Sequence, residues 1–205
     1  MPKASPKKQR TQLERSESTR AELIAAARKA FARDGYANTQ LDALAAKAGV
    51  TKGALYHHFG SKQELFEAVF EDQHRQLAER GVRTHTVEED PRCGLYEACR
   101  AFLEAALDPA LQRILLLDGP SVLGWNRVRD IESRHSVAYL RRGLELAMAA
   151  GLIATRPAAP LAQMLNGAIC EAAMFVARSK DPNTSLAQTL AELQHIVNAL
   201  VTPSA

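Results

Sequence analysis

Apolar residues recur every three or four positions along most of this chain. Leu23, Ala27 and Phe31 follow this spacing near the N-terminus, and Leu186, Leu190 and Leu193 follow it near the C-terminus. Such spacing places the apolar side chains on one face of an α-helix, whereas a half-buried β-strand would alternate polar and apolar residues. Residues 20–60 contain no alternating run of that kind. The pattern therefore predicts an all-α protein.

Polar residues mark where several of these helices begin. A hydroxyl residue three positions before a carboxylate is the sequence signature of a capping box. The candidate pairs are Thr19 with Glu22, Thr39 with Asp42, and Ser61 with Glu64. An aspartate directly before a proline at 90–91 and at 108–109 predicts two further helix starts. About nine helices follow, at residues 20–33, 40–48, 52–57, 62–80, 91–107, 109–117, 121–150, 158–179 and 184–201.

Two of the predicted helices are short and adjacent, at 40–48 and 52–57. Gly49 lies between them, and glycine tolerates the positive φ that a tight turn requires. Two helices joined by a turn of this length form a helix-turn-helix, and the first helix completes a three-helix N-terminal bundle. The second of the pair is polar and too short to be stable alone, and small residues at its start would allow close approach to a DNA major groove.

The same region is similar to the DNA-binding domain of the TetR family of transcriptional regulators. Residues 39–65 read TQLDALAAKAGVTKGALYHHFGSKQEL, and the segment FARDG (31–35) matches the end of that family's first helix. The resemblance covers about residues 19–70. Two positions depart from the family pattern, since Gln40 replaces a frequent Thr or Ser and Thr51 replaces Ser.

The resemblance implies roles for individual residues at a DNA interface. Four residues would hold the DNA backbone: Thr39, Gln40, Tyr56 and Lys62. Four would lie in the major groove: Thr51, Lys52, Gly53 and His57. Lys62 would stand in the first turn of a helix, where free backbone N–H groups also favour phosphate. We expect Phe59 to be a core residue and His58 to be a packed or capping residue rather than a metal ligand.

The charge distribution agrees with a DNA-binding N-terminal part. The chain carries a net charge of +3, which divides into +6 for residues 1–60 and −3 for residues 61–205. We expect a disordered basic tail at 1–17, a helix-turn-helix domain at 18–64 and a helical effector-binding and dimerisation domain at 65–205. The tail is either a solubilising leader or an arm attracted to polyphosphate.

The last two predicted helices carry the strongest apolar stripes. These stripes are Leu161, Leu165, Ala168, Ala172 and Val176, and Leu186, Leu190, Leu193, Val197 and Leu200. Two stripes consecutive in the chain could simply bury each other. The resemblance instead implies a homodimer in which two copies form a four-helix bundle, and this is the arrangement that we expect. A symmetric dimer would bind a near-palindromic operator in double-stranded DNA.

The family's regulatory domain implies a pocket for a small, largely apolar molecule of unknown identity. Candidate lining residues are Phe70, His74, Leu77, Cys99, Phe102, Leu103, Leu115, Trp125, Val128, His135, Met164, Cys170, Glu171, Met174 and Phe175. Taken one by one, most of these are better explained as ordinary core, and Trp125 is either a stacking wall or a packed residue. Glu171 lies in an apolar run, so we expect it to pair with Arg134, Arg141 or Arg142, or else to face a ligand.

Other classes of protein find little support in the sequence. No nucleophile–base pair, phosphate-binding loop or metal-ligand spacing suggests an enzyme, a cofactor or a metal. The three cysteines, Cys93, Cys99 and Cys170, are too few for a disulfide framework and fit buried thiols in a reducing cytoplasm. The strictly apolar runs fall short of the about 20 residues that a bilayer-spanning helix needs, and no signal sequence is evident.

The sequence therefore predicts a cytoplasmic, DNA-binding transcriptional regulator without enzymatic activity. The mechanism that we expect is repression by occupancy of the operator, with release of DNA when a small molecule binds. A DNA-binding dimer without an effector is the alternative, and an all-α enzyme is a remote one.

Overall fold

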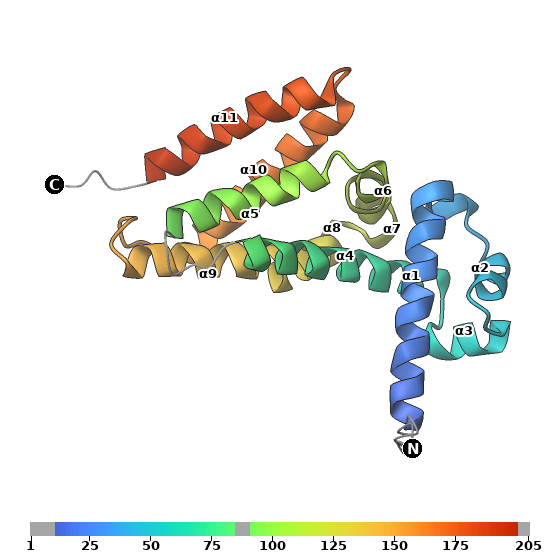
Figure 1. The fold of residues 1–205 in the computed structure, drawn as a ribbon. Coiled ribbons are helices and arrows are strands. Elements are labelled where there is room, and N and C mark those ends of the chain that lie inside the picture. The colour runs from blue at the N-terminus through green and yellow to red at the C-terminus, as the bar shows by residue number, and fades with distance from the viewer. Residues whose placement is uncertain (1–10, 85–90, 201–205) are drawn as a thin grey trace, which may run out of the picture.

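The computed structural model describes residues 11–84 and 91–200, and every regular element in these ranges is a helix (Figure 1). The predicted all-α fold is confirmed. The elements are α1 (Gln12–Asn38), α2 (Leu41–Lys47), α3 (Lys52–His58), α4 (Lys62–Thr84), α5 (Pro91–Ala105), α6 (Pro109–Leu111), the π-helix η1 (Gln112–Asp118), α7 (Gly119–Leu123), α8 (Trp125–Arg134), α9 (Ser136–Ala149), α10 (Ala158–Arg178) and α11 (Pro182–Leu200).

Helices α1, α2 and α3 form the smaller end of the molecule, at the right of Figure 1. The helical geometry of α1 is interrupted at Gly35, with φ 77° and ψ 167°, as the Asp34–Gly35 pair predicts. Gly49, with φ 68°, turns the chain between α2 and α3. Thr51 caps α3, since its hydroxyl oxygen accepts a hydrogen bond of 3.1 Å from the backbone N–H of Ala54. The helix-turn-helix thus forms where the short helices and the glycine predict it.

Helix α1 begins at Gln12, eight residues before the predicted start at Arg20. Thr11 and Glu14 make a complete capping box, in which each side chain accepts a hydrogen bond from the other residue's backbone N–H. This pair has the same spacing as Thr19 and Glu22, so the sequence offers two capping-box signals eight residues apart, and the helix begins at the first of them. Thr19 lies inside the helix and donates its hydroxyl to the carbonyl of Arg15. The expected disorder is therefore wrong for residues 12–17, and residues 1–10 lie outside the described part of the chain.

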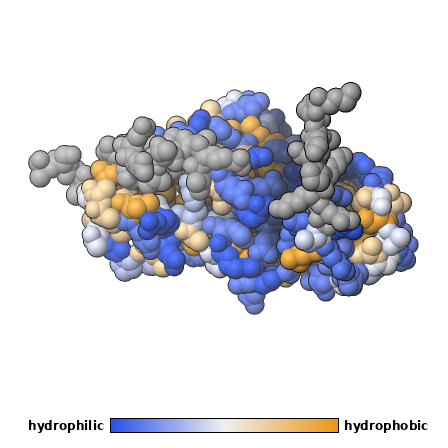
Figure 2. Space-filling view, turned by 60° about the horizontal axis from the view of Figure 1, so that its bottom comes forward, coloured by the Kyte–Doolittle hydropathy of each residue, from blue (hydrophilic) through white to orange (hydrophobic). Residues whose placement is uncertain are grey.

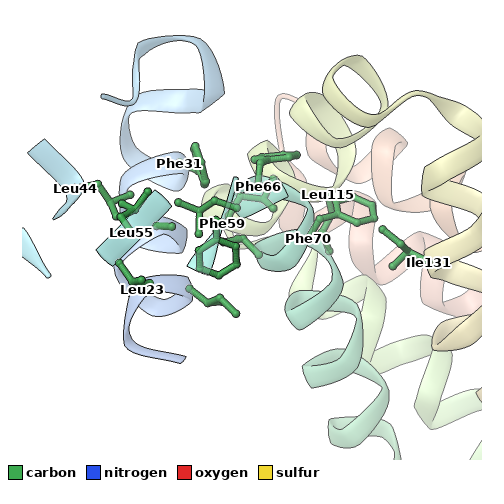
Figure 3. Packing of buried hydrophobic residues seen from close by; sticks show 14 of the residues in the cluster. Leu23, Phe31, Leu44, Leu55, Phe59, Phe66, Phe70, Leu115 and Ile131 are labelled. Atoms are coloured by element: carbon green, nitrogen blue, oxygen red, sulfur yellow. The ribbon is translucent and has the colours of Figure 1, made fainter. Parts of the chain in front are cut away.

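One hydrophobic cluster joins the helix-turn-helix to the larger domain. Figure 3 shows its side chains running from Leu44 on α2, past Phe31 and Phe66, to Ile131 on α8. The rings of Phe31 and Phe66 meet edge to face with centroids 5.1 Å apart. The first half of α4 therefore belongs to both parts of the molecule, and no gap in packing follows residue 64.

A second cluster fills the larger domain, between α5, α9, α10 and α11. In Figure 1, α5 lies between α4 and α11, and it contacts both helices. Among the described helices, α10 alone is long and apolar enough to span a bilayer by length and composition. Its inner face is core, with Leu165, Ile169 and Val176 buried against the neighbouring helices.

Two predicted helices are divided in the structure. The stretch predicted as one helix at 121–150 consists of the end of α7, then α8 and α9, because Gly124 (φ 77°, ψ 154°) and His135 (φ −117°, ψ −84°) leave the helical region. Apolar residues keep a helical spacing across Gly124, so periodicity alone could not reveal that break. At His135 the spacing changes, because five polar residues, 132–136, separate Ile131 from Val137. The stretch 109–117 divides into α6, capped by Asp108 as predicted, and η1.

The two parts of the molecule also meet at the end of α1. The backbone N–H of Tyr36 donates to Oδ2 of Asp118 on η1 over 2.8 Å. A side chain at Gly35 would stand 2.6 Å from Nη1 of Arg113, so glycine permits both the backbone turn and the close approach of η1. This contact fixes the helix-turn-helix against the larger domain.

Candidate DNA-binding surface and effector cavity

Helix α3 is held by one buried residue and exposes most of the rest. Leu55 is fully buried in the first cluster, which anchors the short helix against α1 and α2. The remaining predicted contacts on α3 and its cap form an exposed surface: Thr51, Lys52, Gly53, Tyr56 and His57. The structure thus brings these predicted residues together on one accessible side of the helix. Phe59 is buried, as predicted.

Charge on this surface is partly balanced within the helix-turn-helix. The Lys52 ammonium lies 2.9 Å from Oδ2 of Asp42 on α2, and both side chains are exposed. The hydrogen bond and the negative charge of Asp42 raise the pKa of Lys52, so it is a cation at neutral pH. An exposed pair of this kind is weak, which leaves Lys52 able to exchange Asp42 for a phosphate or a base edge.

The two predicted contacts at the start of α2 differ in exposure. Gln40 is the exposed N-cap residue of α2, and its side chain makes no capping hydrogen bond. Thr39 is only 3 % exposed, and its hydroxyl donates to the carbonyl of Gly35 over 2.8 Å. In this conformation the Thr39 side chain is a structural link between α1 and α2, so its expected contact with DNA through the hydroxyl is not available.

Lys62 lies at the first position of α4 and holds the end of α1. Its ammonium donates to the carbonyl of Ala37 over 3.1 Å and stands 4.6 Å from the centre of the Tyr36 ring. Burial lowers its pKa. Ser61 caps α4 as predicted, accepting from the N–H of Glu64 over 3.1 Å. Lys62 therefore connects the start of α4 to the end of α1. This structural contact exists in addition to the contact with a DNA phosphate that the sequence predicts for Lys62.

A cavity of about 40 Å³ lies in the larger domain between α4, α5, α9 and α10. Its apolar walls are Leu77, Ala78, Cys99, Phe102, Leu140 and Ile169. Its polar walls are Ser136, Tyr139 and Asn166. A second cavity of about 10 Å³ adjoins it and shares Leu77 and Phe102 with it. Such a pocket between the helices of a bundle is a common place for a small ligand.

Only some of the predicted pocket residues line a cavity, while others are buried in the core or exposed on the surface. Cys99, Phe102 and Leu77 line the main cavity, Leu115 lines the second one, and His74 bonds to the lining residue Ser136. Phe70, Leu103 and Val128 are buried core residues away from the cavity walls. The expectation is wrong for Trp125, Met164 and Phe175, which are exposed, and Met174 is half-buried outside the lining.

Sequence reasoning missed all three residues of the polar wall. Ser136, Tyr139 and Leu140 stand three and four positions apart on α9, and Asn166 and Ile169 stand three apart on α10. That spacing places each set on one face of its helix, and the spacing is therefore the sequence feature from which these residues could have been predicted. The break at His135 concealed it, because α9 begins there with its own helical phase.

The buried carboxylate is Glu132, not Glu171. Glu171 is exposed on α10, while two of its proposed partners, Arg134 and Arg141, pair with Glu71 and Glu145. Neither expectation for Glu171 holds, because it lies on the outer side of the helix, opposite Leu165 and Ile169.

Glu132 on α8 is only 5 % exposed and lies beside the cavity. Its Oε2 is 2.6 Å from Nη1 of Arg129 and accepts a hydrogen bond of 3.2 Å from Nδ2 of Asn166. The Cys170 thiol is 3.8 Å from its Oε1. These contacts compensate the charge of Glu132, so the carboxylate is already partnered without a ligand.

Two buried side chains near the cavity are held in their neutral forms. Burial, and then the charge of His135, lowers the pKa of His74 to about 3, and its Nδ1 shares a hydrogen bond of 3.0 Å with the Ser136 hydroxyl. Burial raises the pKa of the Cys99 thiol to about 12. His135 itself pairs with Glu71 over 3.1 Å and lines an open cleft between α1 and α4 rather than the cavity.

The predicted dimer residues mostly face the chain's own core. Leu165, Val176, Leu186, Leu193 and Val197 are buried in the second cluster, and Leu161, Ala172, Leu190 and Leu200 pack against it. Only Ala168 of the set is exposed. The outer faces of the two helices instead expose Met164 (73 %) and Phe175 (58 %) on α10, and Ile196 (48 %) on α11.

Metal ligands do not gather in the described part of the chain, where no three His, Cys, Asp or Glu side chains come together. The rings of His57 and His58 stand edge to face with centroids 5.8 Å apart. The side chain of Cys93 lies outside the described residues.

The geometry agrees with comparisons to known proteins. Residues 23–69 match the family description "Bacterial regulatory proteins, tetR family", and residues 93–200 match "Tetracyclin repressor-like, C-terminal domain". The chain belongs to the TetR family of transcriptional regulators. Members of this family are DNA-binding regulators that act on operator DNA, and the chain is accordingly a regulator and not an enzyme.

Individual relatives of this TetR-family chain match it over different lengths. It is 37 % identical over 103 residues to the HTH-type transcriptional regulator TtgR of Pseudomonas putida, covering 49 % of each chain. The chain spans about half the length of that curated relative. A TetR-family regulator from Pectobacterium atrosepticum has a solved structure that is 38 % identical, with a TM-score of 0.78 over 96 % of this chain and all of the other.

A third relative was solved with a bound molecule. RolR in complex with resorcinol is 20 % identical, with a TM-score of 0.69 over 95 % of this chain and all of RolR. At that identity the likeness concerns the fold alone.

Proposed function

We propose that this chain is a homodimeric repressor that binds a near-palindromic operator and is released from it by a small molecule. One observation carries the proposal: α4 begins at the DNA-binding end with Lys62 and forms a wall of the cavity with Leu77 and Ala78. At about 1.5 Å per residue, Lys62 and Leu77 are roughly 22 Å apart along a single helix. A displacement of α4 at the cavity therefore moves the end that supports α3.

The size of the cavity supports a coupling of this kind. At about 40 Å³ it is far smaller than the roughly 300 Å³ at which ligand pockets in proteins begin. An effector must therefore push α4, α5, α9 or α10 apart, and it binds better to the open state than to the closed one. The closed state is then the DNA-binding state, and effector and DNA oppose each other by linkage.

At the DNA, the exposed residues of α3 and its cap would read the major groove. Thr51, Lys52, Gly53 and His57 are the candidate groove residues, since they are exposed on the N-terminal half and outer side of α3. Gln40, Tyr56 and Lys62 would contact the phosphates and fix the register. Cytoplasmic location follows from this function.

The homodimer would form through the outer faces of α10 and α11. Met164, Phe175 and Ile196 are large apolar side chains exposed on these two helices. On the face shown in Figure 2, the coloured residues are mostly hydrophilic and the hydrophobic ones form small separate patches. Pairing α10 and α11 with their copies makes a four-helix bundle that covers the exposed apolar residues.

The RolR complex gives this proposal indirect support. A protein of the same fold holds the small aromatic molecule resorcinol. A fold that accommodates a small ligand in one protein makes the corresponding use of this cavity chemically reasonable.

The decisive experiment selects DNA fragments from the source genome with the purified full chain. Enriched fragments should share a near-palindrome, and a gel shift should show a dimer whose affinity falls with salt. Failure to enrich any fragment over unrelated DNA would refute operator binding. A library of small molecules is then screened for release of the bound fragment.

The small cavity also favours a second candidate, a DNA-binding dimer without an effector. In that case, molecules that bind the larger domain raise its melting temperature but leave operator affinity unchanged at saturation. Such a result would refute release of DNA by a ligand, but it would leave the proposal of a DNA-binding regulator intact.

A further inference from the structure

The described residues that line the cavity include no charged side chain. Its polar lining residues are Ser136, Tyr139 and Asn166, whose side chains are all neutral. Glu132, which bonds to the lining residue Asn166, is already compensated by Arg129 and by the Asn166 amide. His74, which touches the lining through Ser136, is neutral at physiological pH. An ionised ligand would lose its hydration in this cavity and find no counter-charge, at a high cost in free energy.

The polar groups can hydrogen-bond a neutral ligand in two directions. A hydroxyl both donates and accepts. The Tyr139 hydroxyl makes no side-chain hydrogen bond that the described residues reveal, and the tyrosine is half-buried on the cavity wall. Ser136 is held in place by His74, and Asn166 is held by Glu132. One free hydroxyl and two preoriented polar groups suit a ligand that carries a hydroxyl or carbonyl group.

The remaining walls suit a flat ring. Phe102 and Tyr139 supply two aromatic rings to the lining, and Leu77, Leu140 and Ile169 supply aliphatic side chains. Aromatic ligands gain stacking or edge-to-face contacts with such side chains beyond simple burial. Phe102 and Leu77 line both the main cavity and its small neighbour, so an enlargement at these two side chains affects both. Cavities of about 150 Å³ hold a benzene ring in proteins, which sets the enlargement required.

The lining thiol does not point to a reactive effector. Burial raises the pKa of Cys99 to about 12, so very little thiolate is present at neutral pH. Thiolate is the form that attacks oxidants and electrophiles. Reversible, non-covalent binding is therefore the chemistry that the cavity supports.

We propose that the effector is a small neutral aromatic molecule bearing a hydroxyl group, which hydrogen-bonds to Tyr139 and to the Ser136–Asn166 side of the cavity. The inference rests on the function proposed above, and it narrows the effector to one chemical class. Aromatics that are ionised at neutral pH, such as benzoates and protonated benzylamines, find no counter-charge among the lining residues.

The test uses four probes of similar size on the full chain: phenol, toluene, benzoate and benzylamine. Calorimetric titration at pH 7 should show phenol binding at least about tenfold more tightly than benzoate or protonated benzylamine. Tyr139→Phe should weaken phenol about three- to tenfold and leave toluene unchanged, since only phenol uses the hydroxyl. Tyr96→Phe on α5, outside the cavity lining, is the matched control and should change neither.

Several outcomes would overturn the inference. It fails if benzoate or benzylamine equals phenol in affinity, if phenol does not bind at millimolar concentration, or if Tyr139→Phe leaves phenol unchanged. Operator binding is measured by gel shift on the same preparations. Intact operator binding with any of these failures rejects the ligand class only, whereas loss of operator binding by the wild-type chain rejects the proposed function itself.

Discussion

Lys52 and Lys62 both lie at the DNA-binding end but have different surroundings. Lys52 is exposed and shares a weak surface ion pair with Asp42, whereas Lys62 is half-buried and bound to the Ala37 carbonyl. We expect Lys52→Ala to relax preference at one base position by about 1 kcal/mol. We expect Lys62→Ala to weaken binding to all sequences and to reduce the salt slope by about 1. Gel shifts over a range of salt measure both.

Lys180→Ala serves as the control, because this exposed lysine follows α10, far from α3 along the chain. It should change neither affinity nor slope. Unaltered binding by both the Lys52 and the Lys62 variants would show that the DNA surface has been assigned to the wrong helix.

His74 makes the stability of the larger domain depend on pH. Its pKa is lowered from 6.5 to about 3 by burial, so the unfolded chain binds a proton below pH 6.5 that the folded chain refuses. The stabilisation by neutral His74 is complete above pH 6.5. It should be lost at about 1.4 kcal/mol per pH unit as the pH falls from 6.5 toward 3.

Urea unfolding of the wild type and of His74→Gln at several pH values measures this contribution. The difference between the two free energies of unfolding should shrink as the pH falls. His195→Gln, on the exposed part of α11, should show the wild-type pH dependence. Parallel pH profiles for wild type and His74→Gln would mean that His74 is not the titrating group.

Among the elements, the junction of α1 and η1 depends on a single glycine. Gly35 has φ 77° and ψ 167°, a conformation that side-chain-bearing residues rarely adopt, and a Cβ there would press on Arg113. We expect Gly35→Ala to lower the free energy of unfolding by about 1–3 kcal/mol. Thermal or urea unfolding measures the effect.

Gly143 provides the contrast at element scale. It lies inside α9 with no atom near the position of a Cβ, so Gly143→Ala should stabilise the protein by about 0.5–1 kcal/mol. Equal effects of the two substitutions would show that the backbone at Gly35 is not constrained in solution.

At the scale of the whole molecule, the exposed apolar residues of α10 and α11 bear on assembly. Phe175→Glu places a charge where the proposed dimer buries an aromatic ring, so the mass in light scattering should fall to that of a monomer. Operator affinity should fall with it, because two half-sites are no longer bound together. Leu13→Glu changes an equally exposed leucine on α1 and should leave the mass unchanged. A dimeric Phe175→Glu would place the interface elsewhere.

Local interactions explain which features could be predicted from the sequence. The helix-turn-helix depends on Gly49, on the Thr51 cap and on Leu55, which act within a few residues of each other. The signal for the start of α1 is also local, because it is the capping box of Thr11 and Glu14, although Thr19 and Glu22 have the same spacing. The same holds for the Asp108 cap and for the break at Gly35. Local sequence therefore determined the fold class, the helix-turn-helix and the residues that its second helix exposes.

Only the tertiary structure decided which side of each helix faces which neighbour. Glu171 and Glu132 both lie on helices with apolar stripes, but Arg129 and Asn166 gather around Glu132 alone. The stripes of α10 and α11 became core rather than interface because α9, α5 and the two helices themselves cover them. Helical periodicity reports that a face is buried, but not against what, since burial by the same chain and by a partner select the same apolar residues. The cavity, its neutral walls and the free outer faces of α10 and α11 follow from that packing.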